Sequence, residues 1–204
     1  MIDADNAQYT KLSPILNEIS SHGHIVIKRA YGDWSSENLK NWKKVLNELA
    51  IQPIQQFAYT TGKNSTDILI IIDAMDLLYS QKYDSFVIVS SDSDFTALAS
   101  RLKESEVFVF GVGEQKTPIS FKNACDDFIL TENLGLEDED DVVPSKDKNS
   151  RQKNPTELIP ILNKAWEKYQ DEEGWANVSP VSNFIKRSKP DFDPRSYGRA
   201  KLPD

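Results

Sequence analysis

The feature that most constrains this chain is an apolar run, at residues 86–95, that ends abruptly in two acids. Residues 86–89 are apolar and mostly β-branched, which is typical of a strand buried on both faces, and residues 95–102 have a helical pattern. Asp92 and Asp94 therefore follow the carboxyl end of a strand, where open α/β sheets place their ligands. Two carboxylates this close repel each other unless a cation lies between them, so the pair favours a metal site over a simple helix N-cap.

The sequence also limits which metal such a site can hold. The chain has one cysteine, Cys125, and two histidines, His22 and His24, which are too few and too local for sulfur or nitrogen ligation. These counts exclude a thiolate zinc cluster and a disulfide within the chain. The ligands must therefore be oxygen atoms, which indicates Mg²⁺ or Mn²⁺.

No segment has the character of an export signal or a membrane span. The longest apolar run, residues 68–72, is far too short to cross a bilayer, and no charged start with a following apolar stretch opens the chain. Together with the single cysteine, this predicts a cytoplasmic protein without a membrane partner. Because the net charge is −8, any contact with nucleic acid must rest on local basic patches.

Strands and helices alternate over residues 1–134. We expect helices near residues 12–23, 39–49, 67–80, 95–102 and 118–124, and strands at residues 1–2, 24–31, 53–59, 86–89, 107–112 and 128–130. This alternation predicts a three-layer α/β/α domain with a mostly parallel sheet. A strand normally needs about five residues, and only Met1 and Ile2 precede the first acid, so we expect the natural chain to begin further upstream.

The pattern changes after residue 134. Residues 135–154 predict a flexible linker, because they include the unbroken acidic run 137–141. Residues 155–204 show only helical periodicity, with basic residues gathered late, which predicts a small helix-turn-helix or winged-helix module. We expect this helical domain to be incomplete, because the sequence stops at Asp204 before such a core would close.

Four acids and one amide are expected to meet at one edge of the sheet. Asp3 and Asn6 follow the first strand, Asp92 and Asp94 follow the fourth, and Asp67 begins a helix on the side that packs on the sheet. A simpler alternative for Asp67 is an acid that only complements the helix dipole. With no histidine or cysteine available, the cluster favours a divalent ion that activates water for hydrolysis at phosphorus.

Three separated motifs carry a resemblance to a known family. Residues 2–6 read Ile-Asp-Ala-Asp-Asn, residues 62–67 read Gly-Lys-Asn-Ser-Thr-Asp, and residues 90–95 read Ser-Ser-Asp-Ser-Asp-Phe. In this order they resemble the NYN domain family, a branch of the PIN-like metal-dependent ribonucleases, over residues 1–134. Residues 155–204 are similar to the LOTUS domain, also called OST-HTH, which is associated with RNA binding.

The resemblance implies a ribonuclease whose acids bind the metal and act in catalysis. These acids are Asp3, Asp67, Asp92 and Asp94, and Asn6 would orient a carboxylate or a metal-bound water. Single-stranded or structured RNA would lie across the crevice. We expect its phosphates to meet basic residues on the same edge of the sheet, namely Lys63, Lys28, Arg29 and Lys116. The sequence is also compatible with a homo-oligomer.

Two other functions fit parts of the sequence. A haloacid-dehalogenase-like phosphatase would use Asp3 as nucleophile and Asp5 as general acid, but no cap insertion is evident. A non-catalytic RNA-binding adaptor would use the acids for a structural ion.

The tryptophans add a further expectation. Trp42 and Trp166 lie on apolar helix faces and are expected in the core, while Trp34 and Trp175 are open candidates for base stacking.

Overall fold

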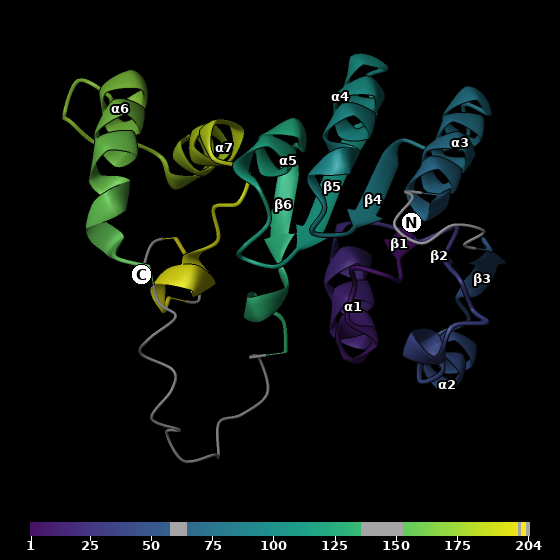
Figure 1. Cartoon of the computed structure of the whole chain (residues 1–204). Helices are drawn as coiled ribbons and strands as arrows, with labels where there is room; N and C mark the ends of the chain where they lie inside the picture. Colours follow the sequence, from purple (N-terminus) through teal and green to yellow (C-terminus); the bar gives the residue numbers. More distant parts are fainter. Residues whose placement is uncertain (58–64, 136–152, 200, 203–204) are drawn as a thin grey trace, which may run out of the picture. The chain divides into compact units, whose positions relative to one another are not determined.

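Figure 1 shows the computed structural model of the chain, which describes residues 1–57, 65–135, 153–199 and 201–202. The chain divides into two compact units, Met1–Leu134 and Gly135–Asp204. Most of the linker expected at residues 135–154 lies outside the described ranges. Within those ranges, no helix combines the length and the apolar character needed to traverse a bilayer.

The first unit is built on one six-stranded parallel sheet in the order β3-β2-β1-β4-β5-β6. Its strands are β1 (Ile2–Asp3), β2 (Arg29–Gly32), β3 (Gln52–Gln55), β4 (Ser85–Val89), β5 (Phe108–Gly113) and β6 (Asp127–Leu130). The first and fourth strands are neighbours, as expected, because Ile2 pairs with Ala30 on one side and with Val89 on the other.

Helices cover both faces of this sheet (Figure 1), which confirms the predicted α/β/α architecture. One face carries α1 (Leu12–His22) and α2 (Trp42–Glu48), and the other carries α3 (Ser65–Tyr79), α4 (Thr96–Glu104) and α5 (Ile119–Ala124). Along β4, Phe86 and Ile88 pack into one core, whereas Val87 and Val89 pack into the other. Burial on both faces explains why this strand reads as a continuous apolar run.

Two strands are shorter than the sequence suggested. The strand expected at residues 24–31 begins only at Arg29, and the one expected at 53–59 is observed as Gln52–Gln55. The reason for the first difference is the shortness of β1. With only two residues, it offers no pairing partner to the segment that leads into β2.

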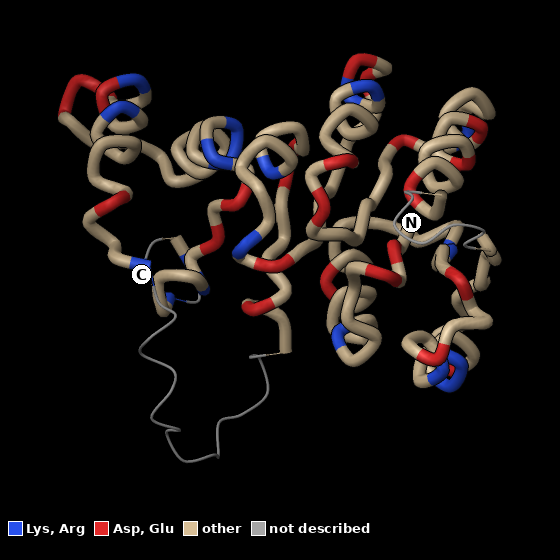
Figure 2. Tube along the Cα trace, in the orientation of Figure 1, with Lys and Arg blue, Asp and Glu red and all other residues tan. Residues whose placement is uncertain are grey.

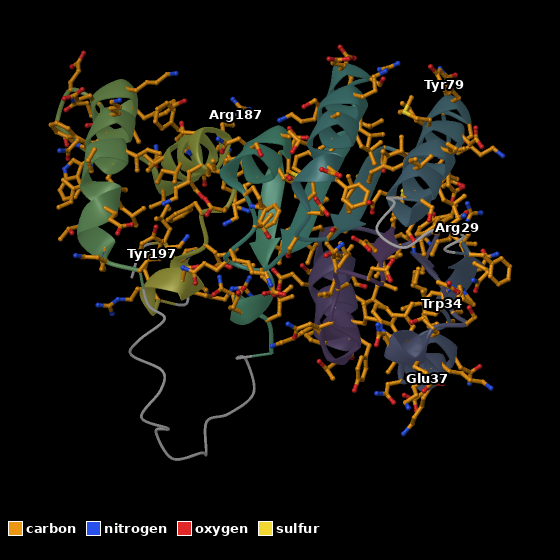
Figure 3. All side chains as sticks on the ribbon, viewed as in Figure 1. Arg29, Trp34, Glu37, Tyr79, Arg187 and Tyr197 are labelled. Atoms are coloured by element: carbon orange, nitrogen blue, oxygen red, sulfur yellow. The ribbon has the colours of Figure 1, made fainter. Side chains whose placement is uncertain are left out.

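The second unit is helical, in agreement with its sequence pattern. The 3-10 helix η6 (Pro155–Leu158) leads into α6 (Ile159–Tyr169), which is followed by α7 (Val178–Ser188) and the 3-10 helix η7 (Pro194–Tyr197). A single antiparallel bridge joins Gln170 to Ala176 between α6 and α7. The small core centres on Leu158, Ile185, Phe192 and Tyr197. Basic residues occupy the last turn of α7, where Figure 2 shows them in blue and Figure 3 labels Arg187.

The four tryptophans differ in burial. Trp42 is 2% exposed, as predicted, but the core prediction for Trp166 is wrong, since that side chain is 46% exposed and donates its Nε1–H to the carbonyl of Gly174. Trp34, labelled in Figure 3, packs edge-on against Trp42 and donates to the carbonyl of Ile54. Trp175 is 74% exposed.

Candidate metal centre

Strand β4 delivers two acids to the carboxyl edge of the sheet. After Val89 the chain turns into the 3-10 helix η3 (Ser93–Phe95), and Asp92 is its N-cap. The Oδ1 atom of Asp92 accepts a hydrogen bond from the N–H of Asp94 at 3.0 Å, and the buried ring of Phe95 anchors the turn in the core. The N-cap interpretation is therefore correct for Asp92, and the cap also fixes where its carboxylate lies.

Asp67 reaches the same place from the first turn of α3. The buried row of this helix runs through Thr66, Ile70, Ala74 and Leu78, so Asp67 lies beside that row and is half-buried. The expectation that Asp67 lies on the side of the helix that packs on the sheet is therefore only approximately right. Its position at the border of the packed face lets the carboxylate remain in contact with solvent while it approaches the acids after β4.

The geometry of these three acids fits a small divalent ion. One carboxylate oxygen from each of Asp67, Asp92 and Asp94 lies within 4.8 Å of the other two. Around an octahedral Mg²⁺ with bonds of about 2.1 Å, ligand oxygens are about 3.0 Å apart when adjacent and about 4.2 Å apart when opposite. Small side-chain rotations would bring all three oxygens to one ion. Asp94 is exposed, so the open side of the group faces solvent.

Asp3 ends β1 beside this group, and three hydrogen bonds fix its carboxylate. Its Oδ2 accepts from Nδ2 of Asn6 and from Oγ of Ser90, both at 2.8 Å, and its Oδ1 accepts from the N–H of Asp5 at 3.1 Å. An ionised carboxylate has about four acceptor positions, so one position remains on Oδ1. The side chain is 1% exposed, and it is not part of the three-acid group found among the described residues.

Two of these carboxyl groups have a raised pKa. The pKa of Asp67 is raised to about 6, mainly by burial and further by the negative charges of Asp3, Asp92, Asp94 and Asp5. Burial also raises the pKa of Asp3, while the hydrogen bonds from Asn6 and Ser90 act in the opposite direction. Negative charge is therefore gathered here at a cost in free energy, and a bound cation would remove that cost.

Ser90 is a structural link that the sequence reasoning missed. Its hydroxyl donates to Asp3 and accepts a hydrogen bond from the N–H of Asp92 at 3.1 Å, so one side chain ties β1 to the loop after β4. Ser90 is also buried, with 1% of its surface exposed. The sequence offered one sign of this role, since Ser90 directly follows an apolar strand and precedes Asp92 by two residues.

Two of the basic residues expected near the acids lie elsewhere. Lys28 and Arg29 were predicted toward the carboxyl end of their strand, but β2 starts at Arg29, so both are at its amino end and the prediction is wrong. Nη1 of Arg29, the side chain labelled in Figure 3, donates to both carboxylate oxygens of Asp73 on α3, at 2.6 and 2.8 Å. Nζ of Lys28 donates to the carbonyl of Leu49 at 2.6 Å. Both side chains have structural partners at this end.

The other two expected phosphate contacts have different outcomes. Lys116 lies in the loop after β5, at the carboxyl edge, where its exposed Nζ is 3.0 Å from Oε2 of Glu114. Lys63 falls outside the described residues. Figure 2 shows that acidic positions, drawn in red, recur throughout the first unit.

Comparison with known sequences decides the family. The sequence profile of the NYN domain matches residues 1–133, which is more than half of the chain. The chain belongs to the NYN domain family. NYN domains have a PIN-like nuclease fold, which agrees with the parallel sheet and the acid cluster at its carboxyl edge.

Two further comparisons complete the description of this NYN protein. The profile of the OST-HTH/LOTUS domain matches residues 150–204, so both parts of the chain resemble RNA-associated domains. A crystal structure of a protein of unknown function from Vibrio parahaemolyticus has a similar fold, with a TM-score of 0.53, 18% identity, and coverage of 63% of this chain and 88% of that chain. No curated protein matches the sequence.

Proposed function

We propose that this protein is a Mg²⁺- or Mn²⁺-dependent ribonuclease that hydrolyses RNA phosphodiesters at the carboxyl edge of its sheet. The observation that carries the proposal is the convergence of Asp67, Asp92 and Asp94, with ligand oxygens within 4.8 Å of one another, in a NYN domain. When bound, the divalent ion supplies positive charge at the scissile phosphate and lowers the pKa of water.

The chain's own residues hold this site in three ways. Asp67, Asp92 and Asp94 are the proposed ligands, and they come from two elements that the fold fixes separately. Asp3 adds negative charge from β1 and offers its remaining Oδ1 position to the ion or to a water. Asn6 and Ser90 hold the Asp3 carboxylate in one orientation, so they are positioning residues.

RNA would approach from the open side of the acid group. Lys116 lies at this edge and is proposed to contact a phosphate, and Lys63 keeps the same role as a prediction from its motif. The phosphatase alternative is disfavoured, because a nucleophilic carboxylate needs a free oxygen, and Asn6, Ser90 and the N–H of Asp5 already donate to the carboxylate of Asp3.

The experiment that tests this function compares two acids at opposite ends of one strand. Asp92→Asn removes a proposed ligand, whereas Asp84→Asn removes an exposed acid directly before β4. We expect Asp92→Asn and excess EDTA each to lower the cleavage of a mixed RNA substrate by about 100-fold or more, while Asp84→Asn behaves as the wild type.

Two results would overturn the proposal. The first is cleavage that persists in EDTA or in the Asp92→Asn protein, because such activity would not come from this site. The second is tight RNA binding with no product over hours in the presence of Mn²⁺. That result would favour the non-catalytic adaptor.

A further inference from the structure

Three polar residues join α3 to the neighbouring strand β2, and none of them is among the proposed metal ligands. Asp73 on α3 accepts two hydrogen bonds from Nη1 of Arg29, at 2.6 and 2.8 Å, and a third from the hydroxyl of Tyr31. Arg29 is labelled in Figure 3. We call Arg29, Tyr31 and Asp73 the Asp73 cluster. It is a directional contact between the sheet and the helix that carries Asp67.

Apart from this cluster, α3 packs on the sheet through apolar side chains. Ile70, Ala74 and Leu78 are buried in the same core as the side chain of Tyr31, which is 0% exposed. Within the described ranges, no other side chain of α3 hydrogen-bonds to a strand. Apolar contacts are non-directional, so they tolerate small shifts of a helix more readily than hydrogen bonds do. The Asp73 cluster therefore restrains how α3 is placed on the sheet.

The placement of α3 decides where the carboxylate of Asp67 lies. Asp67 and Asp73 belong to one continuous helix, Ser65–Tyr79, so a movement at one is transmitted to the other. Side chains extend to about 5–6 Å from a helix axis, so a rotation of about 20° would move the Asp67 carboxylate by about 2 Å. Metal–ligand distances are met only to within about 0.2 Å. A small rotation of α3 would therefore separate Asp67 from an ion held by Asp92 and Asp94.

Tyr31 also contacts the strand that ends in Asp3. Its carbonyl accepts a hydrogen bond from the N–H of Ala4 at 3.0 Å, and Asp3 lies opposite Tyr31 in the pairing of β1 with β2. The pKa of Tyr31 is raised, mainly by burial and further by the hydrogen bond to Asp73, so the hydroxyl keeps its proton and stays a donor. Tyr31 therefore joins the end of β1 to α3, as Ser90 joins β1 to the loop after β4.

We propose that the Asp73 cluster positions the metal site, because it holds α3 where Asp67 meets the two acids that follow β4. The inference rests on the proposed function, since it requires that Asp67, Asp92 and Asp94 share an ion. The alternative is a cluster that only stabilises the fold. A positioning role changes the affinity of the folded protein for the ion, whereas a stabilising role changes the unfolding midpoint alone.

The experiment compares two hydroxyl deletions in the full chain. Tyr31→Phe removes the donor to Asp73 and leaves the buried ring, whereas Tyr79→Phe removes the hydroxyl of a side chain of α3 that is 70% exposed (Figure 3). Titration calorimetry, below the unfolding midpoint of each protein, measures Mn²⁺ binding. We expect Tyr31→Phe to lower the affinity for Mn²⁺ by about 3- to 10-fold, because the bonds from Arg29 remain. Tyr79→Phe should bind Mn²⁺ as the wild type does.

A second pair of variants removes the acceptor of the cluster. Asp73→Ala deletes the partner of both Arg29 and Tyr31, and alanine is well tolerated within a helix. Asp76→Ala, at an exposed position of the same helix, is the matched control, because both variants lose one negative charge. We expect Asp73→Ala to lower the affinity for Mn²⁺ by about tenfold or more, and Asp76→Ala to leave it unchanged.

Two outcomes would overturn the inference. If the wild type binds Mn²⁺, and Tyr31→Phe and Asp73→Ala bind it equally well, the cluster only stabilises the fold, and the proposed function stands. If the wild type binds no Mn²⁺, the proposed function fails and the inference fails with it. The titration of the wild type therefore distinguishes the two failures.

Discussion

The two ends of the central sheet differ in how completely the fold organises them. At the carboxyl end, the carboxylates of Asp3 and Asp92 have hydrogen-bond donors that fix their positions, and three acids approach one point. At the amino end, the same strands border an apolar cavity, and the basic residues there are held by structural partners. The acids that could share an ion are therefore gathered at one end of the sheet, whereas the basic residues at the other end make structural contacts.

The difference shows that charged residues next to a predicted strand can have different roles, depending on which end of the strand they follow or precede. Asp92 and Lys28 both lie next to apolar strands, but parallel strands have a direction, and only residues that follow a strand reach the ligand edge. The predictions below test this contrast, from the largest expected effect to the smallest.

Removing a ligand at the carboxyl end should have the largest effect. We expect Asp67→Asn to lower metal-dependent RNA cleavage by about 100-fold or more, because the amide loses the charge that attracts the ion. Asp76→Asn, an exposed acid on the same helix, is the matched control. Cleavage rates under saturating Mn²⁺ measure the effect. Equal losses in both variants would mean that α3 is merely sensitive to substitution.

Removing the link between β1 and the β4 loop should have an intermediate effect. Ser90→Ala deletes the donor to Asp3 and the acceptor for the N–H of Asp92, so we expect the affinity for Mn²⁺ to fall by about 10- to 100-fold. Titration calorimetry measures it. Ser93→Ala, which alters an exposed hydroxyl in the same turn, should bind as the wild type does. An unchanged affinity in Ser90→Ala would remove Ser90 from the site.

The raised pKa of Asp67 predicts how stability depends on pH in the absence of metal. Folding raises this pKa from 3.8 to about 6, so between these values the folded state binds more protons than the unfolded state. The contribution of Asp67 to the free energy of unfolding is therefore lost as the pH rises from 4 through about 6.

This effect can be separated from other titrations by substitution. In EDTA, we expect Asp67→Asn to be more stable than the wild type at pH 7, and the difference to vanish toward pH 4. Denaturant unfolding curves at the two pH values measure it. A variant that is less stable than the wild type at pH 7 would show that the Asp67 charge is well compensated without metal.

The smallest effect compares one lysine at each end of the sheet. We expect Lys116→Met to weaken RNA binding by about 2- to 5-fold at moderate salt, because one phosphate contact is lost. Lys28→Met, at the amino end, should leave RNA affinity unchanged. Fluorescence anisotropy with a labelled RNA, repeated at two salt concentrations, distinguishes them. The reverse order would place the RNA at the wrong end of the sheet.

The sequence predicted the architecture well, because periodicity and strand ends are local signals. The buried run at residues 86–89 and the acids after it identify β4 and its loop without knowledge of the tertiary structure. The family resemblance, which rests on the motifs at residues 2–6, 62–67 and 90–95, was confirmed by the NYN profile. The roles of the individual acids stay a prediction.

The features that the sequence did not predict depend on where each strand begins and on contacts between residues far apart in the chain. Lys28 and Arg29 were misplaced because the shortness of β1 delays the start of β2, and that is a property of another segment. Ser90 was missed because serine is common after strands, and its role depends on the two partners of its hydroxyl, Asp3 and the N–H of Asp92, which only the structure shows. Trp166 was wrongly assigned to the core because helical periodicity marks an apolar face and not what covers it.

The shortness of β1 has a mechanical consequence. The half-sheets β3-β2-β1 and β4-β5-β6 meet at a seam where Ile2 and Val89 are the one paired position. Asp3 lies on one side of the seam, and Asp92 and Asp94 lie on the other, so each opening of the seam would pull the acids apart. An ion bound between these acids would link the two half-sheets. The free energy needed to open the sheet locally between β1 and β4 would therefore be higher with the ion than without it.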